Sequence, residues 1–411
     1  MKKLTTALSL TAVLALGAQS ATLDERVKAL EEQNEVITEE VLASQSAGFT
    51  TIDTDQSYAG MGAAASKVYY SKSPLSIGGY GEMYYANPDN GDDFADVYRF
   101  VTYVGYRFSD NIILNTEIEY EHGGSADGNP GGKVVVEFMY LDFLWKDEIN
   151  FRVGNLLVPM GIVNLRHEPV LFNTVQRPEV ETVLLPSTWG ENGVMAYGRF
   201  DSLSIDYSAG IVNALNLDSS RTQNADRKWI RSGRIGATNE GSWSPAFVAR
   251  VDYTGINGLL AGVSGYYGGA SNLKDDANAI SGVNATIFDI HAIYDNGPFS
   301  AYGLYTQTSV DGDLGPSAAK KGSGYYVNLA YDVSELIGIS QKLPIFVQYS
   351  NFNPVSETVD GLNEDAQQTE SVIAGFNLFV HDQATLKFEY EKKEINNVSQ
   401  NIFSTGFAFI F

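Results

Sequence analysis

The sequence predicts a transmembrane β-barrel of about sixteen antiparallel strands, preceded by a short N-terminal coiled-coil helix. Three observations predict the barrel. Large apolar side chains occupy alternate positions in the C-terminal residues 401–411, and the same alternation recurs along most of residues 75–411. No stretch reaches the roughly 18 apolar residues that a spanning helix needs. Because only helices and closed barrels pair all their backbone groups in a bilayer, repeated alternating segments of about ten residues favour a barrel.

The first twenty residues have the organisation of a secretory signal peptide. A basic start is followed by a short apolar core, Leu4–Leu16, and by a small-x-small site before Ala21. The core is too short to cross a bilayer as a helix, so we expect residues 1–20 to direct export and to be removed. The chain has no Cys, which excludes a disulfide framework. Its net charge of −23 disfavours a nucleic-acid partner.

Residues 21–43 predict a periplasmic coiled-coil helix. Seam positions recur at alternating spacings of four and three residues: Leu23, Val27, Leu30, Asn34, Ile37 and Val41. This is the a/d pattern of a coiled coil, in which one polar residue fixes register and strand number at a cost in stability. We therefore expect this helix to drive oligomerisation. An amphipathic helix packed on its own barrel and a tether to the cell wall are the alternatives.

Residues 44–74 are rich in Ser, Gly, Ala and Thr without a sustained period, which is typical of a linker. The barrel is predicted over residues 75–411. Its sixteen alternating segments are 75–85, 97–108, 112–121, 133–145, 150–158, 192–200, 203–214, 245–253, 259–269, 284–294, 300–310, 325–333, 343–351, 371–380, 384–393 and 402–411. Short and long connections alternate, as expected of a barrel with periplasmic turns and external loops.

The strand faces opposite the apolar ones carry charges of both signs. In 112–121 the carboxylates of Glu117 and Glu119 share one face, and charges in such a position cannot point into lipid. The same parity predicts a pore-lining set: Arg99, Arg107, Glu117, Glu119, Arg152, Arg250 and Asp289. Sixteen strands enclose an aqueous channel rather than a packed interior, so we expect these side chains to face water. Their mixed signs do not define an ion selectivity.

The connection at about 158–190 is long and partly apolar. We expect it to fold back into the lumen and narrow it, which would bury Leu171, Phe172, Val175, Val183 and Leu184. The same fold would bring a charged set into the channel: Arg166, His167, Glu168, Arg177, Glu179 and Glu181. An outward loop packed on a neighbouring subunit is the alternative. A second long connection, 216–244, is rich in Arg and Lys.

Several segments resemble the phosphate-selective porin O/P family in its broad sense over roughly residues 75–411. They are Arg152–Gly154, Val158–Gly161, Asn164–Pro169, Arg177–Val180 and Arg250–Thr254. The resemblance implies a passive, sixteen-stranded outer-membrane channel, a homotrimer whose third outer loop narrows the pore for small hydrophilic solutes or ions. The phosphate-selective members line the pore with a ladder of arginines. This chain shares with them inward basic residues in general, without a match residue by residue, and its inward acidic residues argue against phosphate.

The resemblance also implies partners. These are outer-membrane lipid and lipopolysaccharide, and the barrel-assembly machinery. The terminal Phe411, with aromatic residues before it on the same face, is similar to the C-terminal assembly signal of bacterial outer-membrane proteins.

Two other classes of function are considered. A barrel hydrolase would use Asp289 and His291, which share a strand face, or His167 beside Glu168. No Ser nucleophile motif accompanies them, so we expect no enzyme activity. An envelope tether or adhesion barrel would act through the coiled coil or the acidic loops. With no Cys and no His pair at i, i+4, we expect neither a metal nor a cofactor.

Overall fold

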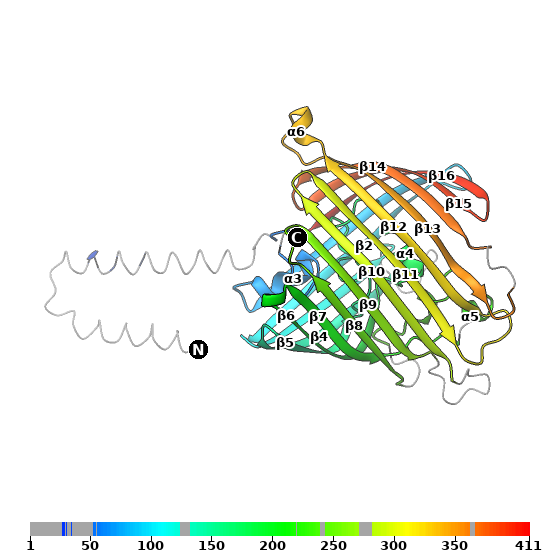
Figure 1. Cartoon of the computed structure of the whole chain (residues 1–411). Coiled ribbons are helices and arrows are strands. Elements are labelled where there is room, and N and C mark those ends of the chain that lie inside the picture. The colour runs from blue at the N-terminus through cyan, green and yellow to red at the C-terminus, as the bar shows by residue number, and fades with distance from the viewer. Residues whose placement is uncertain are drawn as a thin grey trace. The chain divides into compact units, whose positions relative to one another are not determined.

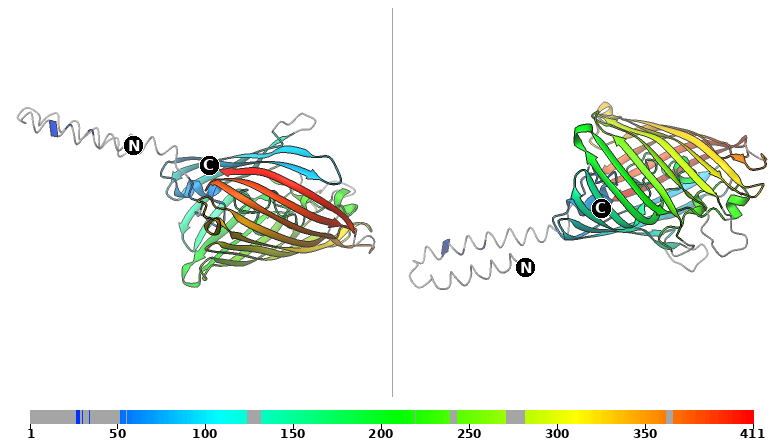
Figure 2. Two further views of the ribbon diagram at one scale, coloured as in Figure 1. Left: turned by 90° about the horizontal axis from the view of Figure 1, so that it is seen from above. Right: turned by 60° about the horizontal axis from the view of Figure 1, so that its bottom comes forward.

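The alternating segments form one antiparallel sheet that closes on itself, as seen in a computed structural model of the chain (Figure 1). The structure describes residues 27, 28, 30, 34, 52–54, 56–123, 132–218, 220–238, 243–270, 282–361 and 366–411. Within these residues the predicted count of sixteen strands is confirmed. Figure 2 shows from two further sides that the strands run obliquely around a single ring.

The strands follow one another around the ring in chain order. Their bounds are β1 Leu75–Pro88, β2 Phe94–Ser109, β3 Ile112–Glu121, β4 Lys133–Lys146, β5 Ile149–Leu157, β6 Gly190–Phe200, β7 Ile205–Asn213, β8 Pro245–Tyr253, β9 Leu259–Gly269, β10 Asn284–Asn296, β11 Phe299–Asp311, β12 Ala319–Asp332, β13 Pro344–Thr358, β14 Thr369–His381, β15 Ala384–Ile395 and β16 Val398–Ile410. The helices are α3 Ala63–Tyr70, α4 Val180–Val183, α5 Ser220–Gln223 and α6 Ser334–Ile337, with 3-10 turns η1 Asp201–Leu203 and η2 Arg231–Gly233.

Pairing between β1 and β16 closes the barrel. Tyr84 stands opposite Gly406 in the antiparallel register. Beyond the end of β16, the backbone N–H groups of Gly79 and Phe411 each donate to the carbonyl oxygen of the other, at 2.9 Å. The last residue of the chain therefore takes part in closure, and no edge strand is left open between β1 and β16.

The outer face of the barrel is apolar. Side chains such as Val263 and Ile290 are more than half exposed although they belong to central parts of their strands. On β16, Phe403 and Phe407 point outward, whereas Ile410, a large apolar side chain on the opposite face of the strand, is buried inside. This outward apolar band is the surface that a bilayer would cover.

The interior differs from the expected water-filled lumen, because a buried apolar cluster occupies part of it. Tyr80 on β1 and Tyr326 on β12 belong to this cluster, together with Trp189 and Trp229 from the connections β5–β6 and β7–β8. The two long connections thus supply side chains that the strand pattern alone does not provide. The two long connections explain the difference, because a sixteen-stranded barrel keeps a water-filled lumen only where no segment of the chain occupies it.

The stretch 44–74, predicted as a linker, also differs in its described part. Residues 63–70 form the helix α3, and Ala63, Ala65 and Val68 are buried. The helix packs against β1, β2 and β3. Its small residues lack a helical hydrophobic period, which explains why composition favoured a linker.

Residues 1–51 form a unit separate from residues 52–411. In it, the seam residues Val27, Leu30 and Asn34 are helical and exposed. The other seam positions, Leu23, Ile37 and Val41, and the predicted signal peptide lie outside the described residues. Among the residues that the structure describes, no helix is long and apolar enough to cross a bilayer.

A charge in the middle of the outward band tests the membrane-facing surface. Ile290, 56% exposed at the centre of β10, is replaced by Arg. We expect the free energy of unfolding in lipid vesicles to fall by about 2–4 kcal/mol, because the guanidinium would sit in hydrocarbon. Ile290→Leu is the matched control and should unfold like the unchanged protein. Equal stability of the Arg variant would show that this band does not face lipid.

Candidate functional site

The connection between β5 and β6, residues 158–189, buries the apolar side chains that the sequence suggested. Phe172, Val175, Val183 and Leu184 are at most 4% exposed, and Leu171 is half-buried. We call this stretch the β5–β6 segment. Burial of so many apolar side chains explains why it does not extend freely into water.

Charged side chains on distant strands hold the backbone of the β5–β6 segment. The N–H of Gly161 donates to Asp289 on β10 at 3.0 Å, and the N–H of Val175 donates to Glu389 on β15 at 2.7 Å. Neither β10 nor β15 neighbours β5 or β6 in the ring. The ammonium of Lys387, also on β15, donates to carbonyl oxygens of the same segment. The segment is therefore fixed at several points around the wall.

Glu181, in α4, organises the tight turn that begins the segment. Its carboxylate accepts the N–H groups of Ile162 and Val163 at 2.9 and 2.7 Å, and the hydroxyl of Tyr326 on β12. Gly161 has a φ of +69°, and a Cβ there would overlap the carboxylate. Burial raises the pKa of Glu181 to about 7, although the hydrogen bonds it accepts oppose that shift.

His167 and Glu168 connect the segment with β3 and α3. The Glu168 carboxylate accepts the N–H groups of Ala64 and Ala65 at 3.1 and 2.9 Å, at the N-terminus of α3. The Nε2 atom of His167 lies 3.1 Å from Glu117. Burial disfavours the charged form of His167, but the neighbouring Glu117 carboxylate outweighs burial and raises the pKa of His167.

The predicted pore-lining residues face inward but are engaged by other parts of the chain. Those at most 7% exposed are Arg99, Glu117, Glu119, Arg152, Arg250 and Asp289; Arg107 is half-buried. Arg99 donates to the carbonyl oxygen of His167 at 3.0 Å, and Arg250 donates to that of Gly161. Most of the set therefore holds the β5–β6 segment or α3 instead of facing open water.

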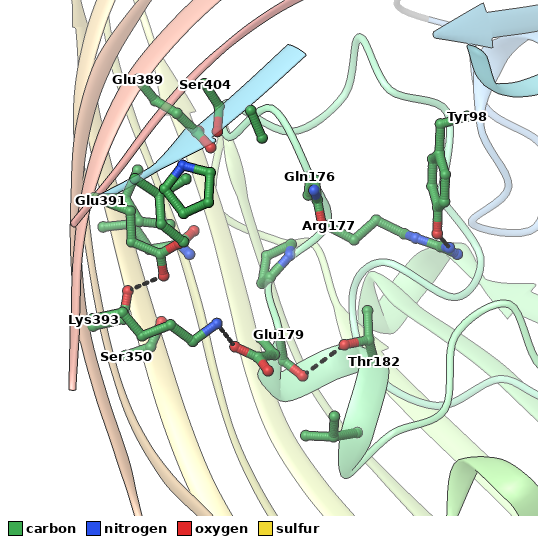
Figure 3. Close-up of a pocket in the computed structure, with 18 of the residues that line it drawn as sticks. Tyr98, Gln176, Arg177, Glu179, Thr182, Ser350, Glu389, Glu391, Lys393 and Ser404 are labelled. Atoms are coloured by element: carbon green, nitrogen blue, oxygen red, sulfur yellow. Dashed lines mark hydrogen bonds and ion pairs between the residues drawn. The ribbon is translucent and has the colours of Figure 1, made fainter. Parts of the chain in front are cut away.

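A cavity of about 680 Å³ remains beside the β5–β6 segment (Figure 3). His122 and Lys133, which border the long connection between β3 and β4, are among its lining residues, so it lies towards that end of the barrel. We call it the outer cavity. From the predicted charged set, Arg177 and Glu179 line it, whereas Arg166, His167, Glu168 and Glu181 do not. Glu389, Glu391 and Lys393 on β15 form the facing wall.

Among the described residues, three arginines of the outer cavity form no ion pair, although the carboxylate of Glu137 attracts Arg234. Arg177 donates through Nη2 to the hydroxyl of Tyr98 at 2.9 Å, while its buried Nη1 has no hydrogen-bond partner in the described part of the chain. Arg231 and Arg234 donate to backbone carbonyl oxygens of the β5–β6 segment. Among the described residues, no carboxylate lies within 4.0 Å of these guanidinium groups. We call Arg177, Arg231 and Arg234 the arginine cluster.

The arginine cluster concentrates positive charge. Burial, followed by repulsion from Arg234 and Arg177, lowers the pKa of Arg231 to about 9. On the facing wall, Lys393 pairs with Glu179 of the β5–β6 segment, which also pairs with Arg227. Glu389 and Glu391 instead accept hydrogen bonds from the N–H of Val175 and the hydroxyl of Ser371. The outer cavity thus has arginines without an ion pair on one side, and on the other one paired lysine and two carboxyl groups without an ion pair among the described residues.

Sequence reasoning missed Arg231 and Arg234. They lie in or next to η2, within the connection whose abundance of Arg and Lys was the available signal. Nothing in that abundance distinguishes a residue that lines a cavity from one on a solvated loop. Arg221, from the same connection, is exposed and pairs with Asp226.

A second cavity of about 480 Å³ opens at the end of the barrel with the short turns. Tyr58, Tyr197 and Arg250 are among its lining residues. We call it the inner cavity. Together the two cavities flank the β5–β6 segment, Arg177 lining one and Leu165 the other.

The residues proposed for a hydrolase, Asp289 and His291, do not bring a nucleophile into contact with a base. Both ring nitrogens of His291 lie against carboxylates, Asp289 at 2.6 Å and Asp252 at 2.8 Å. The hydroxyl of Ser264 donates to Asp289 instead of His291. A catalytic triad requires the hydroxyl on the imidazole, so this cluster lacks that geometry. Among the described residues, no group of His, Cys, Asp and Glu is arranged to hold a metal ion.

Comparison with known proteins identifies one relative by sequence. An uncharacterised protein of Aquifex aeolicus (strain VF5) is 32% identical over 375 residues, which cover 86% of this chain and 84% of that protein. The chain belongs to the family of this protein. No family model matches the sequence.

Several solved structures share the fold of this chain. They include an anion-selective porin from Comamonas acidovorans (TM-score 0.56, 13% identity, 82% of this chain and 99% of that chain) and the outer membrane channel DcaP of Acinetobacter baumannii (TM-score 0.54, 12% identity, 82% and 97%). OmpF of Salmonella typhi, in a complex with daunomycin, has the same TM-score, identity and coverage as DcaP. This chain therefore has the fold of outer-membrane porins.

The raised pKa of Glu181 makes stability depend on pH. Because the pKa is about 7 in the folded protein against an ordinary 4.5, the folded state holds the proton more tightly. The associated stability is complete below about pH 4.5 and is lost as pH rises to 7. We expect Glu181→Gln to remove this part of the pH dependence, measured as urea unfolding in vesicles.

Exposed Glu335 in α6 provides the matched control, and Glu335→Gln should keep the pH dependence of the unchanged protein. Identical pH profiles for the Glu181→Gln variant and the unchanged protein would contradict the assignment.

Proposed function

We propose that this protein is an outer-membrane porin, a passive water-filled channel for small hydrophilic solutes that is narrowed by the β5–β6 segment folded into the lumen. The observation that carries the proposal is the anchoring of this segment to Asp289 on β10 and Glu389 on β15. A loop on the outside of a barrel could not contact inward side chains of such distant strands. The outer and inner cavities on either side of the segment supply the two mouths of the path.

The location and assembly follow from this proposal. The apolar outer band suits the bacterial outer membrane, with lipid and lipopolysaccharide around it. A trimer form of the Vibrio cholerae outer membrane protein OmpT has a related fold (TM-score 0.52, 13% identity) and supports a homotrimer here. The heptad seam of residues 21–43 would join the copies on the periplasmic side, and Phe411 would present the strand that the barrel-assembly machinery takes up.

We propose further that the channel prefers anions. The arginine cluster lines the outer cavity without an ion pair among the described residues, and Nη1 of Arg177 is buried without a hydrogen-bond partner among them. Guanidinium groups bind carboxylate and phosphate oxygens through charge-assisted hydrogen bonds. The fold shared with an anion-selective porin is consistent with this preference. On the facing wall, Lys393 contributes less because Glu179 compensates its charge, and the carboxyl groups of Glu389 and Glu391 act against the preference.

Single-channel recording in planar bilayers tests the porin proposal. We expect conductance steps in multiples of three, and a reversal potential of anionic sign across a KCl gradient. A folded, heat-modifiable barrel that never conducts would contradict the proposal and favour the envelope-tether or hydrolase alternatives. Deletion of residues 21–43 then separates these two, because a tether would lose its association with the cell wall.

The arginine cluster provides a test of the anion preference. Replacing Arg177, Arg231 and Arg234 by Gln should lower the anion-to-cation permeability ratio by roughly tenfold, since three charges at a narrow mouth are removed. Arg221→Gln, an exposed arginine of the same connection, is the matched control and should leave the ratio unchanged. An unchanged ratio in the triple variant would place ion selection elsewhere in the channel.

A further inference from the structure

The helix α3 is held on the inner side of β1–β3 without belonging to the sheet (Figure 1). The described residues 56–73 belong to none of the sixteen strands. The wall is shaped for the helix: a Cβ at Gly105 on β2 would lie 2.6 Å from the Cβ of Val68. Any side chain there would push α3 away from β2, the further the larger the side chain. The helix therefore occupies a prepared position, yet it could leave without breaking any strand pairing.

Opposite charges hold the two ends of α3. The Glu168 carboxylate accepts two N–H groups at the N-terminus, and Arg107 of β2 donates to the carbonyl oxygens of Val68 and Tyr69 at 3.1 and 2.8 Å. This arrangement complements the helix dipole, because an anion lies at the positive end and a cation at the negative end. The anion belongs to the β5–β6 segment, so the position of α3 depends on that segment.

The residues before α3 extend the obstruction across the inner cavity. Tyr58 stacks on Tyr69 with ring centroids 3.8 Å apart, and residues 57–60 line that cavity. Tyr69 also donates to Asp142, which Arg152 holds at 2.9 Å. Residues 56–73 thus cover part of the lumen at the end of the barrel where the short turns lie.

We propose that residues 56–73 are a gate, which closes the short-turn end of the channel when α3 is bound between Glu168 and Arg107 and opens it when α3 withdraws. This inference rests on the proposed porin function. Side-chain hydrogen bonds and the burial of Ala63–Ala65 and Val68 hold the helix, and single substitutions can remove several of these contacts. A wall element, by contrast, could not move without opening the barrel.

Cross-linking tests the gate in the full-length protein, which has no Cys of its own. Val68→Cys with Gly105→Cys places two thiols across the contact between α3 and β2. Their Cβ atoms start 2.6 Å apart, so a shift of about 1 Å brings them to disulfide geometry. We expect the oxidised protein to stay in its closed state, and reduction in the same bilayer to restore openings. The single variant Val68→Cys should respond to neither treatment.

A second pair of variants weakens the binding of α3. Glu168→Gln with Arg107→Gln removes the charges at both ends, and Gly105→Leu fills the space that Val68 occupies. We expect the ratio of open to closed time to rise by roughly tenfold or more, because charge-assisted hydrogen bonds are lost. Ile290→Leu on the outer face is the control and should gate like the unchanged protein.

The outcomes separate the gate from the porin function. If the unchanged protein conducts, but cross-linking and both weakening variants leave its openings unaltered, the gate is overturned and the porin stands. If the weakened variants conduct more but the cross-link has no effect, α3 is a fixed constriction and the gate is again overturned. If neither the unchanged protein nor any variant conducts, the porin function itself fails.

Discussion

Closure of the sheet between β1 and β16 is the constraint on which the rest of the structure depends. A barrel in lipid must pair every backbone group, so the final residues have to reach the first strand, as the mutual hydrogen bonds of Gly79 and Phe411 do. Once the ring is closed, its strand number sets the width of the interior. That width exceeds what wall side chains can fill, and long connections can therefore enter.

Irregular backbone inside such a ring needs hydrogen-bond partners, and the charged wall provides them. Asp289 and Glu389 accept N–H groups of the β5–β6 segment, and Lys387 donates to its carbonyl oxygens. Unpaired peptide groups there would each cost free energy comparable to a lost hydrogen bond. The inward charges are therefore structural as well as electrostatic: they substitute for the water that an unoccupied lumen would offer.

Much of the fold could be predicted from the sequence, because lipid imposes a simple period of two on the strands. The predicted bounds of β3, β8 and β9 agree with the structure. The same period shows that Glu117 cannot face lipid, but it cannot distinguish a side chain in water from one that holds a loop. The helix α3 could not be predicted because it packs on distant parts of the chain, as Val68 does on Gly105, 37 residues further along.

The charges of the interior differ in one respect that bears on function. Arg99 and Arg152 are each matched by a carboxylate, as burial requires of a charge that must stay in place. Arg177, equally buried, retains an unpaired N–H and lies near Arg231 and Arg234, which repel it. Such an arrangement is costly for folding alone, because a neutral or acidic residue at any of the three positions would relieve it. An anion entering the outer cavity would remove the same cost, which agrees with the anion preference that we propose for the channel.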